Sequence, residues 1–576
     1  MILNKIKTEI NGGDNMQIYL AKIKTKPMGI EENFNAADRE IKKAIAANAD
    51  MVILPCAFLT GYNIGILGGA GYAEKLYGEK VEKLAKQNPN IPILADGMFD
   101  GGFYRMLYNV PAEEDEIFRD FEVKGVRFSV LDSADANFLS AAAADLPNRN
   151  PDCIILDATN PAVAGSRLLL HRAMQELSAA CGVPCIADIG GWGDCSYPDF
   201  HMPVIGVADD KKDIFTATFK QYLQAENCYE IGGKFAPTGD IEKVHDLEFK
   251  VEYNQNPLVP AEFSSRDYCL DLFEAQTLAL AARLDNINAK TAVIGLSGGL
   301  DSALALLVTA NAFDLLGRDR KGIYAVSMPG FGTSQTTRDL SKQLADSLGI
   351  DLKVIDITAA CKQALKDIGH DGVTPDVTFE NVQARMRTLN CLNIANMTGG
   401  IMIGTGDLSE EAMGFATYGG DRLASYNVNS SVSKTVIRTM LPYVTRLENL
   451  KSAKEAVNGI LNIPVSPELI PHGGEILQKT EDILAPYKLI DFYIYCFIVA
   501  NVSPAVALEK AKEVFAGEFT PEYLREKALM FYKKFVAGRF KRSAAPEGAN
   551  ITHGALTKEM RYFPSDGSAE IFEELL

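Results

Sequence analysis

The sequence has 576 residues, which is more than one hydrophobic core normally serves, so we expect about two to four domains. Hydrophobic residues make up 47% and charged residues 23% of the chain, proportions that are ordinary for a folded globular protein. The formal net charge of −18 leaves no overall basic field, which argues against nucleic acid or an anionic membrane surface as a partner.

The cysteine pattern and the lack of long apolar runs favour a cytoplasmic protein. The ten cysteines form no paired CxxC pattern, and the close couple Cys181 and Cys185 has no second couple to complete a zinc site. The N-terminus carries no apolar run typical of a signal peptide, and no segment reaches the ~18 apolar residues of a spanning helix. We therefore expect reduced thiols and no membrane association.

The first half of the chain alternates short apolar strands with longer helical stretches, which predicts a layered α/β domain over residues 16–250. A helix through Ile41 and Ile45 follows the first strand, and another helix is expected at 165–182. The expected strands lie at 16–23, 50–55, 91–99, 126–133, 152–159 and 183–189, followed by a hairpin at 202–219.

Residues 251–267 are polar, contain two prolines and lack periodicity, so they are predicted to be a linker. A second α/β domain is expected over 268–576, beginning with a helix at about 268–286. Its strands are almost entirely apolar, as strands covered on both faces must be, which predicts a doubly wound parallel sheet. These strands are expected at 291–296, 322–329 and 351–357, with helices at 302–316 and 336–349.

The stretch VIGLSGGLDSALALL, residues 293–307, leaves a strand through glycines and enters a helix. Such a loop directs backbone N–H groups and the positive helix end at one point, which favours phosphate binding. The Walker and dinucleotide patterns are both absent. A carboxylate at Asp301 repels phosphate unless a cation lies between them, so magnesium is expected there. The alternative is a glycine-rich turn in which Asp301 only caps the helix.

SGGLDS resembles the SGGxDS signature of the PP-loop ATP pyrophosphatases, which bind the pyrophosphate of ATP while an acceptor takes AMP. Three later stretches narrow the acceptor: DVTFENVQARMRTLNCLNIAN at 376–396, GTGDLSEEAMGFATYGGD at 404–421 and SSVSKT at 430–435. With further matches at 466–471, 480–492 and 540–554, residues 255–576 resemble the synthetase domain of the NAD+ synthetase family.

The resemblance implies that deamido-NAD+ is adenylated by ATP and then amidated by ammonia, with release of pyrophosphate and AMP. It implies Asp301 and Glu410 as magnesium ligands, Lys434 as a phosphate contact and Asp421 as the acidic residue near the ammonia pocket. The family motifs further assign binding roles to Ser297, Gly298, Gly299, Ser302, Thr405, Asn381, Arg385, Lys541 and Arg542.

Each of these residues also has an ordinary structural interpretation. Glu410 could be a surface carboxylate, Lys434 a solvated lysine, and Arg385 part of an exposed helical face. Their joint occurrence in family order favours the functional interpretation.

Residues 16–245 resemble the nitrilase fold, an αββα sandwich that supplies ammonia in glutamine-dependent NAD+ synthetases. The resemblance rests on ADMVILPCAFLTGY at 49–62, YN at 108–109 and GVRFSVLDSAD at 125–135. Such enzymes use a glutamate base, a lysine and a cysteine nucleophile, each with a separate task.

Here the sequence departs from that pattern three times. Cys56 stands where the base is expected, and Ser133 stands where the nucleophile is expected. The lysine-bearing segment is reduced to an acidic stretch between Val110 and Glu122, with Lys124 the only lysine nearby. We therefore expect an inactive glutaminase, with Cys56, Cys153, Cys181, Cys185 and Cys195 as core thiols.

Three functions follow from the sequence. The first is an ATP-dependent NAD+ synthetase, a homo-oligomer that takes free ammonia or ammonia from a partner protein. The second keeps glutamine dependence through an unrecognised nucleophile such as Cys56. The third is a nucleotide-binding assembly protein without catalysis.

Overall fold

The computed structural model describes residues 16–61, 72–99, 102–110, 120–131, 139–157, 163–189, 204–216, 218–247, 249–463, 484–556 and 570–576. The chain forms two compact units. Unit 1 holds the described residues up to 157 and from 166 to 247, and unit 2 holds residues 163–165 and those from 249 onward.

Unit 1 contains two mixed sheets, each with a parallel centre and antiparallel edges. The first has the order β11-β1-β2-β3-β4 and consists of Cys228–Ile231, Met16–Leu20, Met51–Ile53, Ile93–Phe99 and Gly102–Tyr108. The second has the order β10-β9-β8-β7-β6-β5 and consists of Asp213–Phe215, Val204–Ala208, Cys185–Ile189, Cys153–Leu156, Val126–Leu131 and Asp120–Val123. The antiparallel pair β9 and β10 is the hairpin expected from the sequence.

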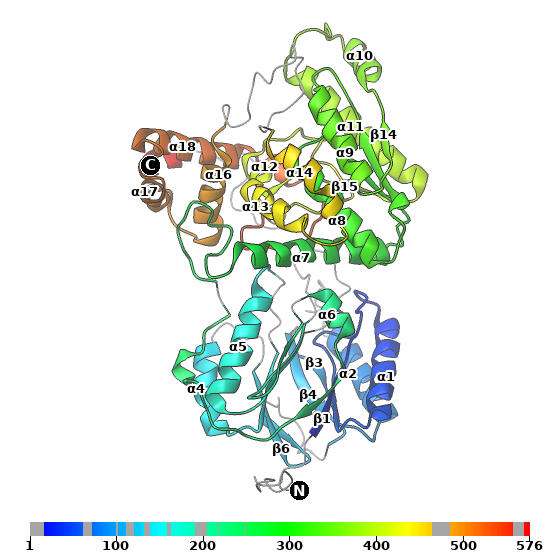
Figure 1. Ribbon diagram of the computed structural model, residues 1–576, viewed down its shortest axis with the longest axis vertical. Coiled ribbons are helices and arrows are strands. Elements are labelled where there is room, and N and C mark those ends of the chain that lie inside the picture. Colours follow the sequence, from blue (N-terminus) through cyan, green and yellow to red (C-terminus); the bar gives the residue numbers. More distant parts are fainter. Residues whose placement is uncertain are drawn as a thin grey trace, which may run out of the picture. The chain divides into compact units, whose positions relative to one another are not determined.

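Helices cover the outer face of each sheet. Helices α1 (Ile30–Ala46) and α2 (Tyr72–Gln87) contribute to one core with β1, β2 and β3, and α4 (Leu139–Arg149) and α5 (Ser166–Cys181) contribute to another with β6, β7, β8 and β9. Figure 1 shows the strands of unit 1 between these two helix pairs. The αββα layering expected from the sequence is therefore confirmed.

Helix α1 shows how the apolar spacing sets the layer. Phe34, Ala37, Ile41 and Ala44 recur every three or four residues, so they share one face and are buried. Ile45, which the sequence also placed in this helix, lies off that face and is exposed.

Unit 2 is built on one parallel sheet with the order β14-β13-β12-β15-β16. The strands are Leu352–Val354, Ile323–Ser327, Ala292–Gly295, Ile401–Gly404 and Tyr426–Asn427. Helices α8 (Leu300–Leu315) and α9 (Gln335–Ser347) pack on one face, with α7 (Ser265–Asn286) against α8. Helices α10 (Thr358–Asp367) and α11 (Val377–Thr398) form a core with the other face. The expected doubly wound parallel sheet is confirmed.

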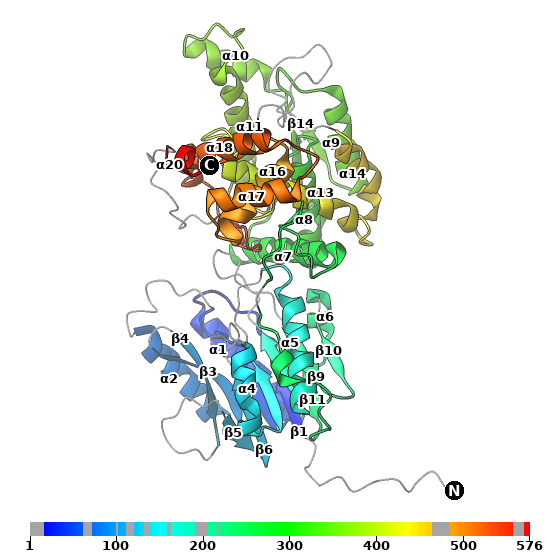
Figure 2. The same ribbon diagram turned by 90° about the vertical axis from the view of Figure 1, so that its left-hand side faces the viewer.

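Beyond the sheet and its covering helices, the described part of unit 2 contains further helices joined by loops. Figure 2 shows α16, α17 and α18 as neighbouring helices near the C-terminus. The remaining helices of both units are α6 Phe219–Gln224, α12 Leu408–Met413, α13 Lys434–Val444, α14 Lys454–Leu461, α16 Tyr487–Ile494, α17 Pro504–Val514, α18 Pro521–Ala537, α19 Arg539–Arg542 and α20 Ile571–Leu575.

The segment expected to be a linker belongs to unit 2 over its whole length. Leu258 and Val259 are buried there, and the backbone N–H of Glu252 donates to the Tyr495 hydroxyl at 2.9 Å. Helix α7 begins at Ser265, a few residues earlier than expected, because Ser264 caps it by accepting from the N–H of Asp267. Among the described helices, none is long and apolar enough to cross a membrane.

Candidate active site

The candidate site lies where the strand order of the unit 2 sheet reverses. Strands β12 and β15 are neighbours in the sheet, but β13 and β14 lie to one side and β16 to the other. In doubly wound sheets, ligands bind beyond the carboxyl ends of the strands at such a point. The SGGLDS loop follows β12 and the GTGD segment follows β15, so both motifs meet there.

The loop after β12 is shaped by one glycine and two hydroxyls. Gly298 adopts a φ of +85°, and a Cβ there would lie 2.5 Å from the carbonyl oxygen of Thr337. The hydroxyls of Ser297 and Ser302 lie 3.1 Å apart, and the N–H of Gly299 donates to Ser297 Oγ at 3.3 Å. Gly299 is the N-cap residue of α8, so Asp301 lies within the first turn rather than capping it.

Three carboxylates surround the ammonium group of Lys434. Lys434 Nζ lies 2.6 Å from Asp301 Oδ2, 2.6 Å from Asp407 Oδ2 and 3.0 Å from Glu410 Oε1. The side chain of Lys434 is only 3% exposed, so the solvated-lysine interpretation is wrong. Asp301 and Glu410 keep 20% and 24% of their side chains exposed, which makes them the part of the cluster that a ligand can reach.

The charge of this cluster is unbalanced. Burial raises the pKa of Asp301 to about 7 and that of Glu410 to about 8, in spite of the attraction of Lys434. Burial opposes the charge of Lys434, but the three carboxylates outweigh it and hold its pKa well above the usual value. One ammonium group thus faces three carboxylates that repel one another, and a second cation would reduce this repulsion.

A divalent cation fits this donor set. Asp301, Asp407 and Glu410 each offer a carboxylate oxygen, and these oxygens lie within 4.8 Å of one another. Asp301 Oδ1 is buried and has no hydrogen-bond partner among the described residues. Carboxylate oxygens beside a phosphate site are the ligands that Mg²⁺ prefers.

Two helix N-termini place the cluster. Asp407 caps α12 through Oδ1, which accepts from the N–H of Glu410 at 2.9 Å, while its other oxygen contacts Lys434. Ser433 caps α13 by accepting from the N–H of Val436, which makes Lys434 the first residue of that helix. The capping residues thus fix the start of each helix and therefore the positions of Glu410 and Lys434.

A pocket of about 340 Å³ opens beside the cluster. This volume lies in the range of small-molecule sites. Of the residues expected from the sequence, those that line the pocket are Ser297, Gly298, Gly299, Asp301, Thr405, Glu410, Asp421 and Lys434. Ser302 lies behind the loop, 3% exposed, where its hydroxyl donates to the carbonyl of Gly299.

Besides Ser302, four expected residues do not line this pocket but make hydrogen bonds to segments around it. Asn381 accepts from the Thr417 hydroxyl at 2.8 Å, and Arg385 donates to the carbonyl of Tyr418 at 3.3 Å, so α11 holds the segment before Asp421. Lys541 donates to the carbonyls of Gly414 and Ala416 at 2.8 Å. Arg542 is buried, and it donates to the carbonyl of Ala412 at 3.1 Å.

Sequence reasoning missed Asp407, the fully buried member of the cluster. It stands in the quoted GTGDLSEE stretch three residues before Glu410, which is the spacing of a helix N-cap. Arg338 and Arg387 were also missed, and both line the pocket. Neither stands out in the sequence, since only the fold shows that α9 and α11 both reach this pocket.

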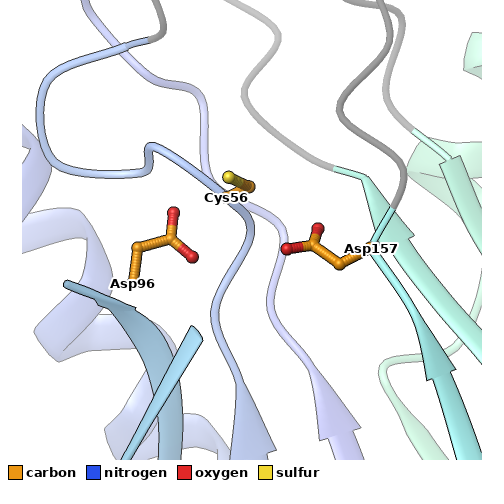
Figure 3. A group of neighbouring side chains, drawn as sticks. All are labelled: Cys56, Asp96 and Asp157. Carbon is orange, nitrogen blue, oxygen red and sulfur yellow. The ribbon is translucent and has the colours of Figure 1, made fainter. Parts of the chain in front are cut away.

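Unit 1 contains a second buried polar group, formed by Cys56, Asp96, Arg105 and Asp157. Figure 3 shows the carboxylates of Asp96 and Asp157 turned toward one another, with Cys56 between them. Burial raises the pKa of the Cys56 thiol well above its usual value, and the charges of Asp96 and Asp157 raise it further. Cys56 is thus held as a protonated thiol, as expected for a core cysteine.

Arg105 is the cation of this group and ties the two sheets together. It lies on β4 and donates to both oxygens of Asp157, just beyond β7, at 2.7 and 3.0 Å. Its Nη1 also lies 3.3 Å from Asp96 Oδ1. A guanidinium group already supplies positive charge among these acids, so this group does not need a metal ion.

The other residues singled out in unit 1 are not among the four of this buried polar group. Ser133, Cys195 and most of the acidic stretch between Val110 and Glu122 lie outside the described residues. Cys153 and Cys185 are buried, as expected of core thiols. Cys181 is only partly buried because it is the last residue of α5.

Comparison with known proteins gives one family model, described as NAD synthase, which matches residues 272–514. The glutamine-dependent NAD(+) synthetase of Mycobacterium tuberculosis is 35% identical over 362 residues, covering 58% of this chain and 52% of the relative. The corresponding protein of Mycobacterium leprae is 34% identical over 363 residues, with the same coverage. The chain therefore spans about half the length of the curated relatives it matches.

Two solved structures share the fold over nearly the whole chain. A glutamine-dependent NAD(+) synthetase from Cytophaga hutchinsonii has a TM-score of 0.71 at 14% identity, covering 98% of this chain and all of the other. A glutamine-dependent NAD+ synthetase from Acinetobacter baumannii, in complex with adenosine diphosphate, has a TM-score of 0.61 at 18% identity. It covers 95% of this chain and 97% of its own. At these identities the likeness is one of fold.

Proposed function

We propose that this chain is an ATP-dependent NAD+ synthetase, a carbon–nitrogen ligase that converts deamido-NAD+, ATP and ammonia to NAD+, AMP and pyrophosphate. The observation that carries the proposal is the cluster of Asp301, Asp407 and Glu410 around Lys434, beside the SGGLDS loop. The match of residues 272–514 to the NAD synthase model supports the choice of substrate.

The first step needs a phosphate site and a means of offsetting charge. A carboxylate oxygen of deamido-NAD+ forms a bond to the α-phosphorus of ATP, and the bond to pyrophosphate breaks. The SGGLDS loop leads into the N-terminus of α8, where N–H groups and the helix dipole favour the departing pyrophosphate. Ser297 and Thr405 add hydroxyl groups on the same pocket wall.

Asp301 and Glu410, with Asp407 behind them, would hold Mg²⁺, which neutralises phosphate charge when it is bound. Lys434 keeps its proton among these carboxylates, and it reduces their mutual repulsion before nucleotide arrives. Asp407 thus adds a third carboxylate to the pair of Asp301 and Glu410 that the sequence indicates.

In the second step, the nitrogen of ammonia attacks the adenylated carbonyl and AMP leaves with the carboxylate oxygen. An ammonium ion must lose a proton before its nitrogen can attack, so a carboxylate near the pocket is required. Asp421 is exposed on the pocket wall and is positioned by accepting from the N–H of Thr417 at 2.8 Å. We assign it this role.

We further propose that the ammonia comes from solution or from a partner protein, not from glutamine hydrolysed in unit 1. By the family pattern, Cys56 stands where the base is expected, and burial beside Asp96 raises the pKa of its thiol well above the usual value. A thiol that is itself protonated cannot accept a proton from a nucleophile. The loss of the nucleophile is inferred from the sequence alone, which has Ser133 where the family pattern has a cysteine.

A second candidate function is a glutamine-dependent synthetase, and the names of the Mycobacterium relatives favour it. It requires a nucleophile other than Ser133. Cys56 is a poor candidate because burial and, to a smaller extent, the acids Asp96 and Asp157 raise its pKa, whereas a nucleophilic cysteine needs an environment that lowers it. A cytoplasmic location and a homo-oligomeric assembly stay predictions.

The products of ATP cleavage test the proposal. Purified protein with Mg²⁺, ATP, deamido-NAD+ and ammonium is expected to form NAD+, AMP and pyrophosphate in equal amounts. Chromatography of the nucleotides and an enzymatic pyrophosphate assay measure all three. Formation of ADP and phosphate would exclude the adenylation route, and nucleotide binding without turnover would favour the assembly-protein alternative.

A further inference from the structure

We infer that Asp491, on helix α16, is the positioning residue of the carboxylate cluster, and that it acts by joining the N-termini of α12 and α13. This inference rests on the proposed function only in its consequence for turnover. Asp491 is 1% exposed and is not a member of the pocket lining.

Asp491 accepts hydrogen bonds from both helices. Its Oδ1 accepts from the Ser409 hydroxyl of α12 at 2.5 Å. Its Oδ2 accepts from the Thr435 backbone N–H of α13 at 3.0 Å and lies 2.5 Å from the Thr435 hydroxyl. One buried carboxylate therefore spans the residues that stand next to Glu410 and Lys434.

Ser409 connects Asp491 to Lys434, the first residue of α13. Its oxygen accepts from the backbone N–H of Lys434 at 2.9 Å while its proton goes to Asp491. The first three N–H groups of α13 are thus satisfied by Ser409, Asp491 and the cap Ser433. Since a helix start leaves these donors without intrahelical partners, the link fixes where Lys434 begins the helix.

Helix α16 carries a second contact to the same lysine. Tyr487 lies one turn before Asp491, on the same face of the helix, and Lys434 Nζ lies 5.3 Å from the centre of its ring. The backbone of Lys434 is thus held through Asp491 and Ser409, and its ammonium group faces Tyr487. Both contacts come from one helix.

The chemistry of the link requires an ionised carboxylate. Asp491 receives donors on both oxygens, and asparagine could offer only one acceptor oxygen. In either orientation, an asparagine amide would point a donor at the N–H of Thr435 or at the hydroxyl of Ser409. Asp491→Asn should therefore release α12 from α13 with almost no change in side-chain volume.

The test uses Mn²⁺ as a paramagnetic probe of the cluster, with the full-length protein at pH 8 and a fixed concentration of ATP. Electron paramagnetic resonance measures free Mn²⁺, so its affinity is obtained without turnover. Asp491→Asn and Ser409→Ala are each expected to weaken Mn²⁺ binding about tenfold or more. The double variant should be no weaker than the weaker single variant, because both residues belong to one link.

Asp271→Asn is the matched control. Asp271 is also a buried carboxylate of unit 2, and it accepts from the N–H of Gly165 at 2.7 Å, but it does not line the pocket. The Asp271→Asn variant should bind Mn²⁺ as tightly as the parent protein and form NAD+ at the parent rate.

Wild-type affinity in folded Asp491→Asn or folded Ser409→Ala would overturn the inference, as would additive effects in the double variant. If Asp491→Asn does not fold, Ser409→Ala decides. If the parent protein binds Mn²⁺ with ATP but forms no AMP, the proposed function fails while the positioning role of Asp491 stands.

Discussion

Among single residues, Asp301 offers the most direct test of the metal site. Asp301→Asn is expected to lower the ATP-cleaving rate by at least about 100-fold, because phosphate charge would lose a ligand of its counterion. Lys434 would keep its contacts to Asp407 and Glu410, so the melting temperature should change little. Initial rates at saturating Mg²⁺ measure the effect.

Asp346→Asn is the control for Asp301→Asn. Asp346 forms an exposed pair with Lys342 on α9, and loss of such a pair has little effect on stability or rate. Equal rates for the Asp301 and Asp346 variants would show that the carboxylate of Asp301 has no role in turnover.

Asp491 also gives the protein a pH-dependent stability. Burial raises its pKa to about 6, although the bonds from Ser409 and Thr435 favour the charged form, whereas an unfolded aspartate has a pKa of about 3.9. Folding therefore loses stability as the pH rises from about 4 through 6, because the buried Asp491 ionises over this range at a cost in free energy. The charged form that links α12 and α13 prevails above it. The unfolding free energy of the parent protein, relative to Asp491→Asn, should fall by roughly 2 kcal/mol between pH 4 and pH 7.

Urea unfolding of both proteins at several pH values measures this difference. Parallel pH profiles for the parent protein and Asp491→Asn would contradict the raised pKa.

At the residue scale, the sequence predicted site members that carried a motif and missed those that carried only geometry. Asp301, Glu410 and Lys434 were found because the family motifs assign them roles, whereas Asp407 and Asp491 stand in the quoted stretches without such an assignment. The contact of Asp407 to Lys434 and those of Asp491 to Ser409 and Thr435 join residues that are distant in sequence, so only the fold shows them.

At the scale of elements, the turn between β12 and α8 depends on Gly298. Gly298→Ala is expected to lower the melting temperature and to abolish ATP binding, because its φ is positive and its Cβ would meet a backbone oxygen. Gly299→Ala is the matched control, since its φ is −91° and its Cβ would meet only the Ser297 hydroxyl at 3.4 Å. Thermal unfolding and ATP titration distinguish the two, and equal losses would contradict the strain argument.

The stability of unit 1 depends on Arg105, which joins its two sheets. Arg105→Met leaves Asp157 and Asp96 buried without their cation, which typically costs about 3–5 kcal/mol. Arg127→Met, on β6 of the second sheet, removes an exposed arginine from the same unit and should cost little. Chemical unfolding followed by circular dichroism measures both, and equal stabilities would show that Arg105 is not needed to join the sheets.

Elements with a strong apolar period were predictable, and their ends were less so. Strands β12 and β13 of the parallel sheet and the presence of helix α1 follow directly from the sequence, whereas β15 and β16 were not predicted. The early start of α7 depends on Ser264 as a cap, and the burial of Leu258 depends on packing within unit 2. Neither leaves a periodic signal.

For the whole molecule, the sequence predicted both α/β architectures because each half alternates strands and helices. It could not show how polar groups pair within unit 1, since Cys56, Asp96, Arg105 and Asp157 come from four separate segments. Their arrangement as an ion-paired core supports the proposal that unit 1 is a scaffold without glutaminase activity.

The choice of nitrogen donor tests the central claim most directly. Steady-state NAD+ formation should be compared with ammonium and with L-glutamine as the only nitrogen source, with glutamate release measured in the same samples. We predict NAD+, AMP and pyrophosphate with ammonium, and background rates of both NAD+ and glutamate formation with glutamine. Glutamate released in step with NAD+ formation, in a preparation free of contaminating glutaminase, would contradict the claim that unit 1 is a scaffold.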